Sequence, residues 1–273
     1  MNNGTSGNSG YLMLGRESTI GVPVATTHTV PMTEETLTSE LNTNGESLVF
    51  GSKAARLLTT PGIRSHGGDI TVLAEPTSTA LLFDALLPRT SITSIGSGFY
   101  SWLFNSTSWA STGSYTIDVS KGITVSRFSG VQASEISPSW TDNRQSWKLK
   151  VSALKAFSGA VITNAATATL TLDSANSPRP AELLRVGDTI GIRHINGTTE
   201  NNTILSKTDT TVTLTTTPGT TANGDVFYLR PVRFPPDGGH RDSGINGSAG
   251  RMSSCPANAG LSRPSTRSRP PAG

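Results

Sequence analysis

The sequence predicts a mainly β protein in three parts. An antiparallel β-sandwich or barrel with one flanking helix is expected over 1–159, a small added all-β domain over 160–230, and a disordered basic tail rich in Gly, Pro and Arg over 231–273. Three observations predict this. The 273 residues include 39 threonines, 35 serines, 28 glycines and 16 prolines, which is typical of strands joined by tight turns. Apolar and polar residues alternate in many short segments, and only one segment has convincing helical spacing.

Alternation is clearest in the second half of the first part. The segment 115–120 alternates, Lys121 and Gly122 turn the chain, and 123–126 alternates again, which predicts a hairpin. A further strand over 146–153 places Trp147, Leu149, Val151 and Ala153 on a buried face and Ser146, Lys148, Lys150 and Ser152 on a wet face. Ile70 and Val72 predict one more strand, directly before the helix.

The helix is expected from Pro76 to Leu87. Proline is suited to a first helical turn, Thr77 or Ser78 could satisfy free amides, and Pro88 stops the helix. Its apolar side, formed by Leu82, Phe83, Leu86 and Leu87, would pack on one face of the antiparallel sheet. A second short turn is possible over 52–58, within a long polar stretch from Glu34 to Gly68 that has little core of its own.

Residues 160–230 predict four or five short strands in a small β-barrel or sandwich. Two Gly-Asp pairs, Gly187-Asp188 and Gly224-Asp225, each precede a strand. Tight turns explain both pairs, and calcium or sugar binding by the two aspartates is the alternative.

The basic character of the chain lies at its end. Residues 231–273 hold six arginines and two aspartates, whereas 1–230 hold 16 Lys and Arg against 17 Asp and Glu. General attraction of the folded part for nucleic acid is therefore not expected. The tail has few apolar residues and no period, so it is either a natural flexible segment or a translation in a shifted reading frame that replaces strands.

Catalytic and metal-binding motifs are missing from the sequence. Cys255 is the single cysteine, the four histidines are scattered, and no Gly-x-Ser-x-Gly motif, phosphate loop or dinucleotide fingerprint is complete. Carboxylates that a glycosidase could use are Glu34, Glu35, Asp69, Glu75 and Asp84, and each has a simpler structural explanation. Trp102, Trp109, Trp140 and Trp147 could stack on sugars or bases, but core or interface burial is favoured. We therefore expect no catalytic residue, metal, cofactor or small-molecule substrate.

The first residues have no basic or apolar leader, and no stretch is long and apolar enough for a membrane helix, so we expect synthesis and folding in a cytoplasm and no membrane partner.

Several short phrases, in order, resemble a tail tube protein (major tail protein) of long-tailed bacteriophages. The phrases are Gly15 to Val24, Gly67 to Val72 running into the helix, Gly122 to Arg127, and Phe128 to Val131 followed by the strand around Trp147. The resemblance covers 1–159. It implies a β-sandwich whose inner sheets join around a hexameric ring, rings that stack into a tube, contacts with other tail proteins, transient contact with genomic DNA in the lumen, and a virion tail assembled in the bacterial host cytoplasm.

The resemblance also gives the 34–68 stretch a role, as the loop that reaches a neighbouring subunit or ring. Its interface candidates are Leu48, Phe50, Lys53, Arg56, Leu57 and Leu58. The 160–230 part would be a domain added on the tube exterior. The chain departs from the family beyond it, because the tail offers no strands to complete the body sheet. Two alternatives stay open: another phage surface or decoration protein that binds host glycans, and a carbohydrate-active enzyme.

Overall fold

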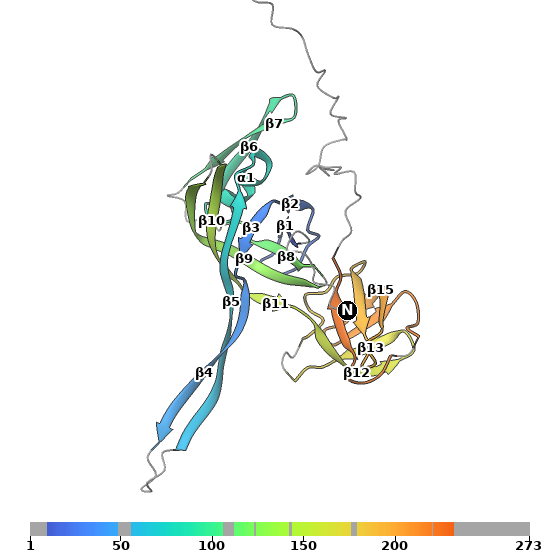
Figure 1. Ribbon diagram of the computed structural model, residues 1–273. Coiled ribbons are helices and arrows are strands. Elements are labelled where there is room, and N and C mark those ends of the chain that lie inside the picture. Colours follow the sequence, from blue (N-terminus) through green and yellow to red (C-terminus); the bar gives the residue numbers. More distant parts are fainter. Residues whose placement is uncertain are drawn as a thin grey trace, which may run out of the picture. The chain divides into compact units, whose positions relative to one another are not determined.

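The computed structural model describes residues 10–48, 56–105, 112–122, 124–141, 144–175, 179–219 and 221–231. The chain divides into two units, Met1–Gly238 and Gly239–Gly273, and every described residue belongs to the first. The predicted mainly β fold with one helix is confirmed for these residues (Figure 1). The predicted tail over 232–273 and Cys255 lie outside them.

The first part of the chain, called the body here, contains two antiparallel sheets that share one strand. The first sheet has the order β2 (His28–Val30), β1 (Gly10–Arg16), β8 (Tyr115–Lys121), β9 (Val125–Thr141) and β11 (Lys155–Phe157). The second has the order β9, β10 (Arg144–Ala153) and β5 (Arg56–Leu73), with β3 (Met32–Glu35) and β4 (Thr38–Leu48) both paired to β5. Strand β9 pairs with β8 up to Val131 and with β10 from Gln132 onward, so it carries the chain from one sheet into the other.

The core of the body lies where the two sheets and the helix meet. The predicted hairpin β8–β9 and the predicted strand face on β10 are confirmed, since Leu149 and Val151 are buried and Lys148 and Lys150 are exposed. The most enclosed core side chains come from both sheets and are Leu12, Val30, Val72, Tyr115, Val119 and Val131. Each contributes about 1.5–3 kcal/mol by leaving water.

Helix α1 (Pro76–Asp84) ends three residues earlier than predicted, and Leu86 and Leu87 lie in the turn that follows. The expected cap at Ser78 is wrong. Glu75 is the N-cap residue and makes no side-chain cap bond, and the buried Ser78 hydroxyl has no partner. The other end is held firmly, because the fully buried Asp84 accepts hydrogen bonds of 2.6 Å from the Tyr115 hydroxyl and from Arg16 Nε.

Strand β8 differs from a strand with one wet face. Its polar residues Thr116, Asp118 and Ser120 are buried along with the apolar ones. The reason is a set of buried polar partners: the Thr116 hydroxyl donates to Glu17 Oε1 at 2.9 Å, and Asp118 pairs with Arg127. Glu17 also accepts from the Ser114 hydroxyl and from two backbone amides, so its buried carboxylate is hydrogen-bonded on both oxygens.

The long polar stretch 34–68 was predicted as a loop, and this is wrong for its described residues. Strands β4 and β5 form a long antiparallel hairpin whose register runs from Thr38↔Gly67 to Leu48↔Arg56. The possible turn over 52–58 is also not supported at its end, because 56–58 belong to β5. These two strands are rich in Thr, Ser and Gly and have no apolar face. The sequence therefore lacks the alternation of apolar and polar residues from which a strand is predicted. Figure 1 shows this hairpin extending away from the sheets.

Residues 160–229 form a closed six-stranded antiparallel barrel. Its strands are β12 (Ala160–Ala166), β13 (Thr169–Leu172), β14 (Thr189–Arg193), β15 (Thr199–Lys207), β16 (Thr211–Leu214) and β17 (Val226–Leu229). Their order is β12-β13-β16-β15-β14-β17, and pairing of β17 with β12 closes it. Its core, which includes Ile162, Leu184, Ile190, Leu214 and Phe227, is separate from that of the body.

Arg127 on β9 connects the body to the barrel. It donates to Asp118 of β8 through Nε at 2.7 Å, to Asp188 of the barrel through Nη1, and to the Leu183 carbonyl at 3.2 Å. Burial alone would lower the pKa of Arg127, but the bonds and charges of the two aspartates raise it above its ordinary value. Backbone pairing of Leu229 with Val125 lies beside this ion pair. The barrel is therefore fastened to the body by a buried charge network as well as by chain connectivity.

We predict that Arg127→Ala destabilises the protein by about 3–5 kcal/mol, because it leaves the buried Asp118 without its cation and Asp188 with only Arg185, 3.8 Å away. Urea unfolding followed by circular dichroism should show a lower midpoint. Arg179→Ala is the matched control, since Arg179 and Asp209 form an exposed pair of the kind that contributes about 0–1 kcal/mol. Equal, small shifts for the two variants would contradict a central role for Arg127.

Candidate assembly surfaces

The second sheet is open at both edges in the part of the chain that the structure describes. Beyond Ala133, β9 pairs with β10 on one side and with no described strand on the other. Pro138 lies in this stretch and cannot donate a backbone hydrogen bond, which is typical of edge strands. At the other edge, β3 and β4 each pair with β5 alone. Open edges of this length are places where another chain can add strands.

The exposed face of this sheet carries balanced charge. Lys148 and Lys150 project from β10, and the register places Thr71 and Asp69 of β5 beside them on one side, and Ser137 and Glu135 of β9 on the other. Lys148 Nζ lies 3.0 Å from Asp69 Oδ2.

Three carboxylates, those of Asp69, Glu34 and Glu135, surround Lys148. The hydrogen bond and charge of Asp69, followed by the charges of Glu34 and Glu135, raise the pKa of Lys148 above its ordinary value. The wet face that the sequence predicts for this strand therefore carries acidic groups beside its lysines.

A second hairpin, β6 (Arg89–Gly96) with β7 (Phe99–Phe104), forms a separate two-stranded sheet. Gly96, Ser97 and Gly98 all have positive φ and make its turn, which explains the Gly-x-Gly sequence without a nucleotide. At its base, Trp102 and Phe104 stack with centroids 6.2 Å apart, and Phe104 also packs on Phe83 of helix α1.

The predicted interface candidates fall on the β4/β5 hairpin only in part. The register pairs Leu48 with Arg56, Ser47 with Leu57, and Glu46 with Leu58. Phe50 and Lys53 lie outside the described residues. Their role in contacts between subunits stays a prediction.

The tryptophans are divided between core and surface. Trp147 is half-buried, packs against the body core and meets Phe83 edge-on at 5.4 Å. Trp102 lies under Arg89, 5.3 Å from its guanidinium carbon, whereas Trp140, near the open end of β9, is 70% exposed. Trp109 lies outside the described residues.

Three of the five carboxylates considered for glycoside hydrolysis have structural partners. Glu35 lies 2.7 Å from Lys121, Asp69 pairs with Lys148, and Asp84 is buried between Arg16 and Tyr115. The Tyr115 hydroxyl has its pKa raised, first by burial and then by the Asp84 charge, so it stays protonated as a donor.

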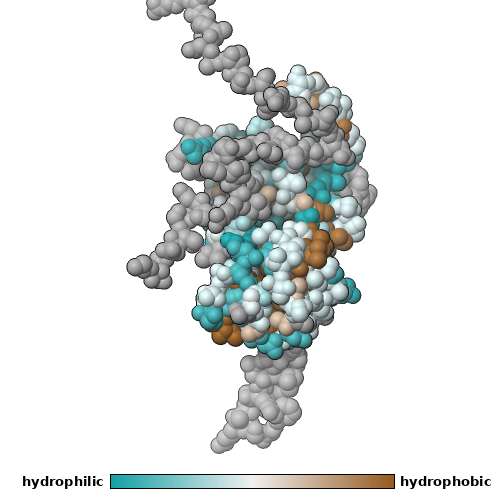
Figure 2. Space-filling view, turned by 90° about the vertical axis from the view of Figure 1, so that its right-hand side faces the viewer, coloured by the Kyte–Doolittle hydropathy of each residue, from teal (hydrophilic) through white to brown (hydrophobic). Residues whose placement is uncertain are grey.

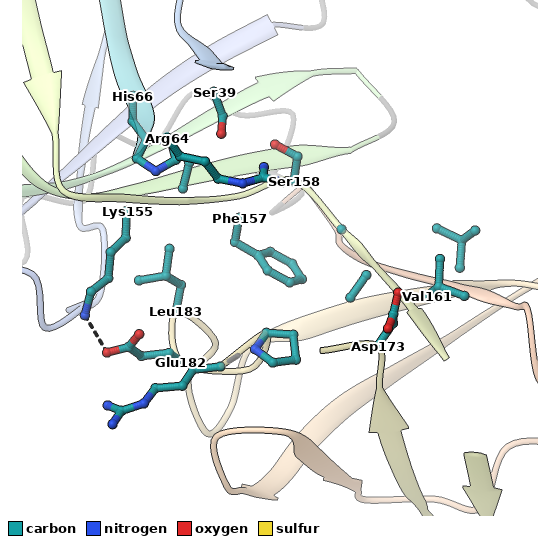
Figure 3. Close-up of a pocket in the computed structure, with 16 residues that line it drawn as sticks. Ser39, Arg64, His66, Lys155, Phe157, Ser158, Val161, Asp173, Glu182 and Leu183 are labelled. Atoms are coloured by element: carbon teal, nitrogen blue, oxygen red, sulfur yellow. Dashed lines mark hydrogen bonds and ion pairs between the residues drawn. The ribbon is translucent and has the colours of Figure 1, made fainter. Parts of the chain in front are cut away.

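A cavity of about 650 Å³ is lined by β5, by the 155–161 segment and by the barrel (Figure 3). Figure 3 shows Lys155 pointing to Glu182 and Arg64 extending beside Ser158, with Phe157 and Leu183 between them. His66 on β5 has a buried Nδ1 without a partner, and burial followed by the charge of Arg64 lowers its pKa. The lining also holds the carboxylates of Asp173 and Glu182, and Glu182 pairs with Lys155.

The sequence analysis did not predict the polar partners of His194. His194 is buried in the barrel, with Nδ1 2.8 Å from Asp225 Oδ2 and Nε2 3.7 Å from Glu200 Oε1. Asp225 also accepts from the amides of Ile195 and Ala222, so the Gly-Asp pair at 224–225 ends a turn, as expected. The other Gly-Asp pair gives Asp188 to Arg127. Neither aspartate is left free for calcium or sugar.

Two searches of the described residues gave negative results. They contain no group of three or more His, Cys, Asp or Glu side chains that could hold a metal ion. They also contain no helix with the length and apolar character needed to cross a membrane.

The comparisons with known proteins give little. No protein-family model matches the chain, and no curated protein is significantly similar. Among solved structures, one match is the tail of an empty GTA particle, determined by helical refinement with C6 symmetry. It is 12% identical, the match covers 55% of this chain and 95% of the other, and the TM-score is 0.32. A TM-score this low carries no argument about function.

We predict that the barrel loses stability as the pH falls below about 4. Burial of Asp225 on its own would raise its pKa, but hydrogen bonds from the Ala222 amide, His194 and the Ile195 amide hold it below the ordinary value. A depressed pKa in the folded state stabilises the fold above the unfolded-state pKa, and this stabilisation disappears as pH falls through the folded-state value.

Thermal unfolding measured between pH 3 and pH 7 checks this. Asp225→Asn should flatten the acid limb of the curve and lower the melting temperature at pH 7. Asp209→Asn is the control, because Asp209 is exposed, and it should leave the curve almost unchanged. Identical acid limbs for all three proteins would show that Asp225 does not contribute.

Proposed function

We propose that this chain is a non-enzymatic structural subunit that assembles into stacked hexameric rings, which form the tail tube of a bacteriophage and conduct its DNA. The observation that carries the proposal is the second sheet of the body, which is open at both edges. The phrases of sequence that resemble tail tube proteins fall in both sheets of the body. They lie in β5 and β10 of the second sheet, and in β1, the β8–β9 turn and the start of β9 in the first.

Ring closure gives both edges a partner. The β9 edge of one copy and the β3/β4 edge of the next are different surfaces, so their contact is heterologous, and a repeated heterologous contact closes into a ring if its rotation permits. The inner sheets then continue from subunit to subunit as one barrel, without the open edges that promote uncontrolled association.

The exposed face of the second sheet suits the wall of a DNA channel. Two lysines beside three carboxylates, Asp69, Glu34 and Glu135, give it no excess of positive charge. Phosphate groups are held mainly by unpaired Lys and Arg. A wall with this composition would let DNA pass without retaining it.

The remaining parts have matching roles in this proposal. The β4/β5 hairpin extends from the sheet and would contact the neighbouring subunit or ring. The barrel would lie on the tube exterior, where other tail proteins or surfaces are met. The localisation that follows is the virion tail, after assembly in the host cytoplasm.

Negative-stain electron microscopy of the purified protein tests the proposal. Wild type should form rings or tubes. A variant lacking 45–60 should stay a folded monomer, because the strands that pair with the rest of the second sheet remain, and it should form no tubes. Circular dichroism is the control for folding. Tubes of normal length from the deletion variant would remove the hairpin from the contact, and a wild type that stays monomeric under all conditions would contradict the proposal itself.

We predict weak DNA binding by the assembled wild type and much stronger binding after the charge balance is removed. Asp69→Asn, Glu34→Gln and Glu135→Gln together leave Lys148 and Lys150 unpaired on one face. Filter binding at 50 mM and 200 mM salt should show a gain that falls steeply with salt. Asp173→Asn, Glu182→Gln and Asp209→Asn in the barrel form the matched control. Equal binding by both triple variants would mean that the face does not meet DNA.

A further inference from the structure

We propose that the β6/β7 hairpin is a contact surface for a second copy of this chain, at the same subunit boundary as the open edge of β9. The inference rests on the proposed self-assembly and adds a specific surface to it. Neither the sequence pattern nor the family resemblance singled out this segment as an interface.

Both faces of the hairpin expose large apolar side chains. Strand β7 exposes Phe99 at 67%, Tyr100 at 57% and Leu103 at 57%, and strand β6 exposes Ile95 at 69%. Phe99 and Leu103 lie on one face of β7, and Tyr100 lies on the other. On the face drawn in Figure 2, side chains coloured brown form patches separated by teal and white ones.

The hairpin also lacks the charges that protect exposed strands. Between Arg89 and Asp118 the sequence contains no Asp, Glu, Lys or Arg. Edge strands that must stay single are usually blunted by lysine, by inward charges or by proline. Beyond Arg89, which lies at the base of the hairpin near Asp84, the β6/β7 strands have none of these, so their composition is that of a segment with a partner.

The base of the hairpin is held by the body, but its outer part is not. Trp102 and Phe104 pack near helix α1, and the Asn105 amide donates to the Pro88 carbonyl at 3.0 Å to close the base. Beyond that point no third strand among the described residues pairs with these two, and an isolated two-stranded hairpin is only marginally stable in water. A partner that covers the outer part would therefore form the contact and also stabilise the hairpin itself.

The position of the hairpin indicates that its partner is the copy that pairs with the open edge of β9. The Ala133 amide donates to the Ala85 carbonyl at 3.0 Å, so the end of helix α1 lies where the open edge of β9 begins. The hairpin starts four residues later, at Arg89. A second copy that adds its strand to β9 would come against the hairpin, so the two surfaces are continuous.

The exposed area is also of the right order. Aromatic side chains bury about 150–250 Å² each, so these partly exposed residues offer roughly 500 Å² in total. A stable interface buries about 800 Å² per partner. The hairpin alone is therefore smaller than a stable interface, and a contact along the edge of β9 would add to its area.

Hydrogen exchange and assembly assays on the full chain test the proposal. In wild type, amide exchange over 90–104 should slow at least tenfold on going from monomer to ring. Phe99→Ser with Leu103→Ser should lower the assembled fraction at least tenfold while the monomer keeps its circular dichroism spectrum. Ile195→Ser with Leu205→Ser is the matched control, because both side chains are more than half exposed and lie in the barrel, and it should assemble like wild type.

Thr93→Lys adds a charge to the exposed strand β6 without removing apolar area, and it should also reduce assembly. Thr163→Lys in the barrel is its control. If wild type forms rings but 90–104 exchanges equally fast in ring and monomer, the hairpin proposal is wrong and the proposed function stands. If the double serine variant assembles like wild type, the same conclusion follows. If wild type forms only a two-fold dimer through this hairpin, the surface is right and the ring is wrong.

Discussion

The path of strand β9 is the constraint on which the rest of the structure depends. Its 17 residues pair with β8 and β11 in one sheet and with β10 in the other, and Val125 at its start pairs with the barrel. Because one strand belongs to both sheets, their relative placement is fixed by its bend, and the core between them is closed by helix α1. Arg127 on the same strand then fixes the barrel through Asp118 and Asp188.

This arrangement leaves some strand edges hydrogen-bonded within the chain and others without a partner among the described strands. The barrel closes its own hydrogen-bond ladder, and β8 buries both faces, so neither needs a partner. The second sheet and the β6/β7 hairpin are different, since their outer edges have no described strand beside them. Both lie next to the end of α1. The proposed self-assembly would give all of these edges a partner at once.

Part of the fold was predictable from the sequence, because some elements show their pattern within a short stretch of the chain. Alternation identified the β8–β9 hairpin and the buried face of β10, and Pro76 and Pro88 bracketed the helix. The β4/β5 hairpin was missed because two polar strands without a core face have no apolar period. The partners of Asp118, Asp188 and His194 were also missed. Each such contact joins residues that are distant in the sequence, and only the bend of β9 and the closure of the barrel bring them together.

The most direct measurement is a high-resolution cryo-electron microscopy map of the assembled protein. It should resolve the outer edge of β9 over 134–141 beside β3 and β4 of the adjacent copy, with continuous backbone hydrogen bonds around a six-fold ring and the Lys148 face towards the axis. Particles in which copies touch only through their barrels, with both edges of the second sheet in solvent, would contradict the account.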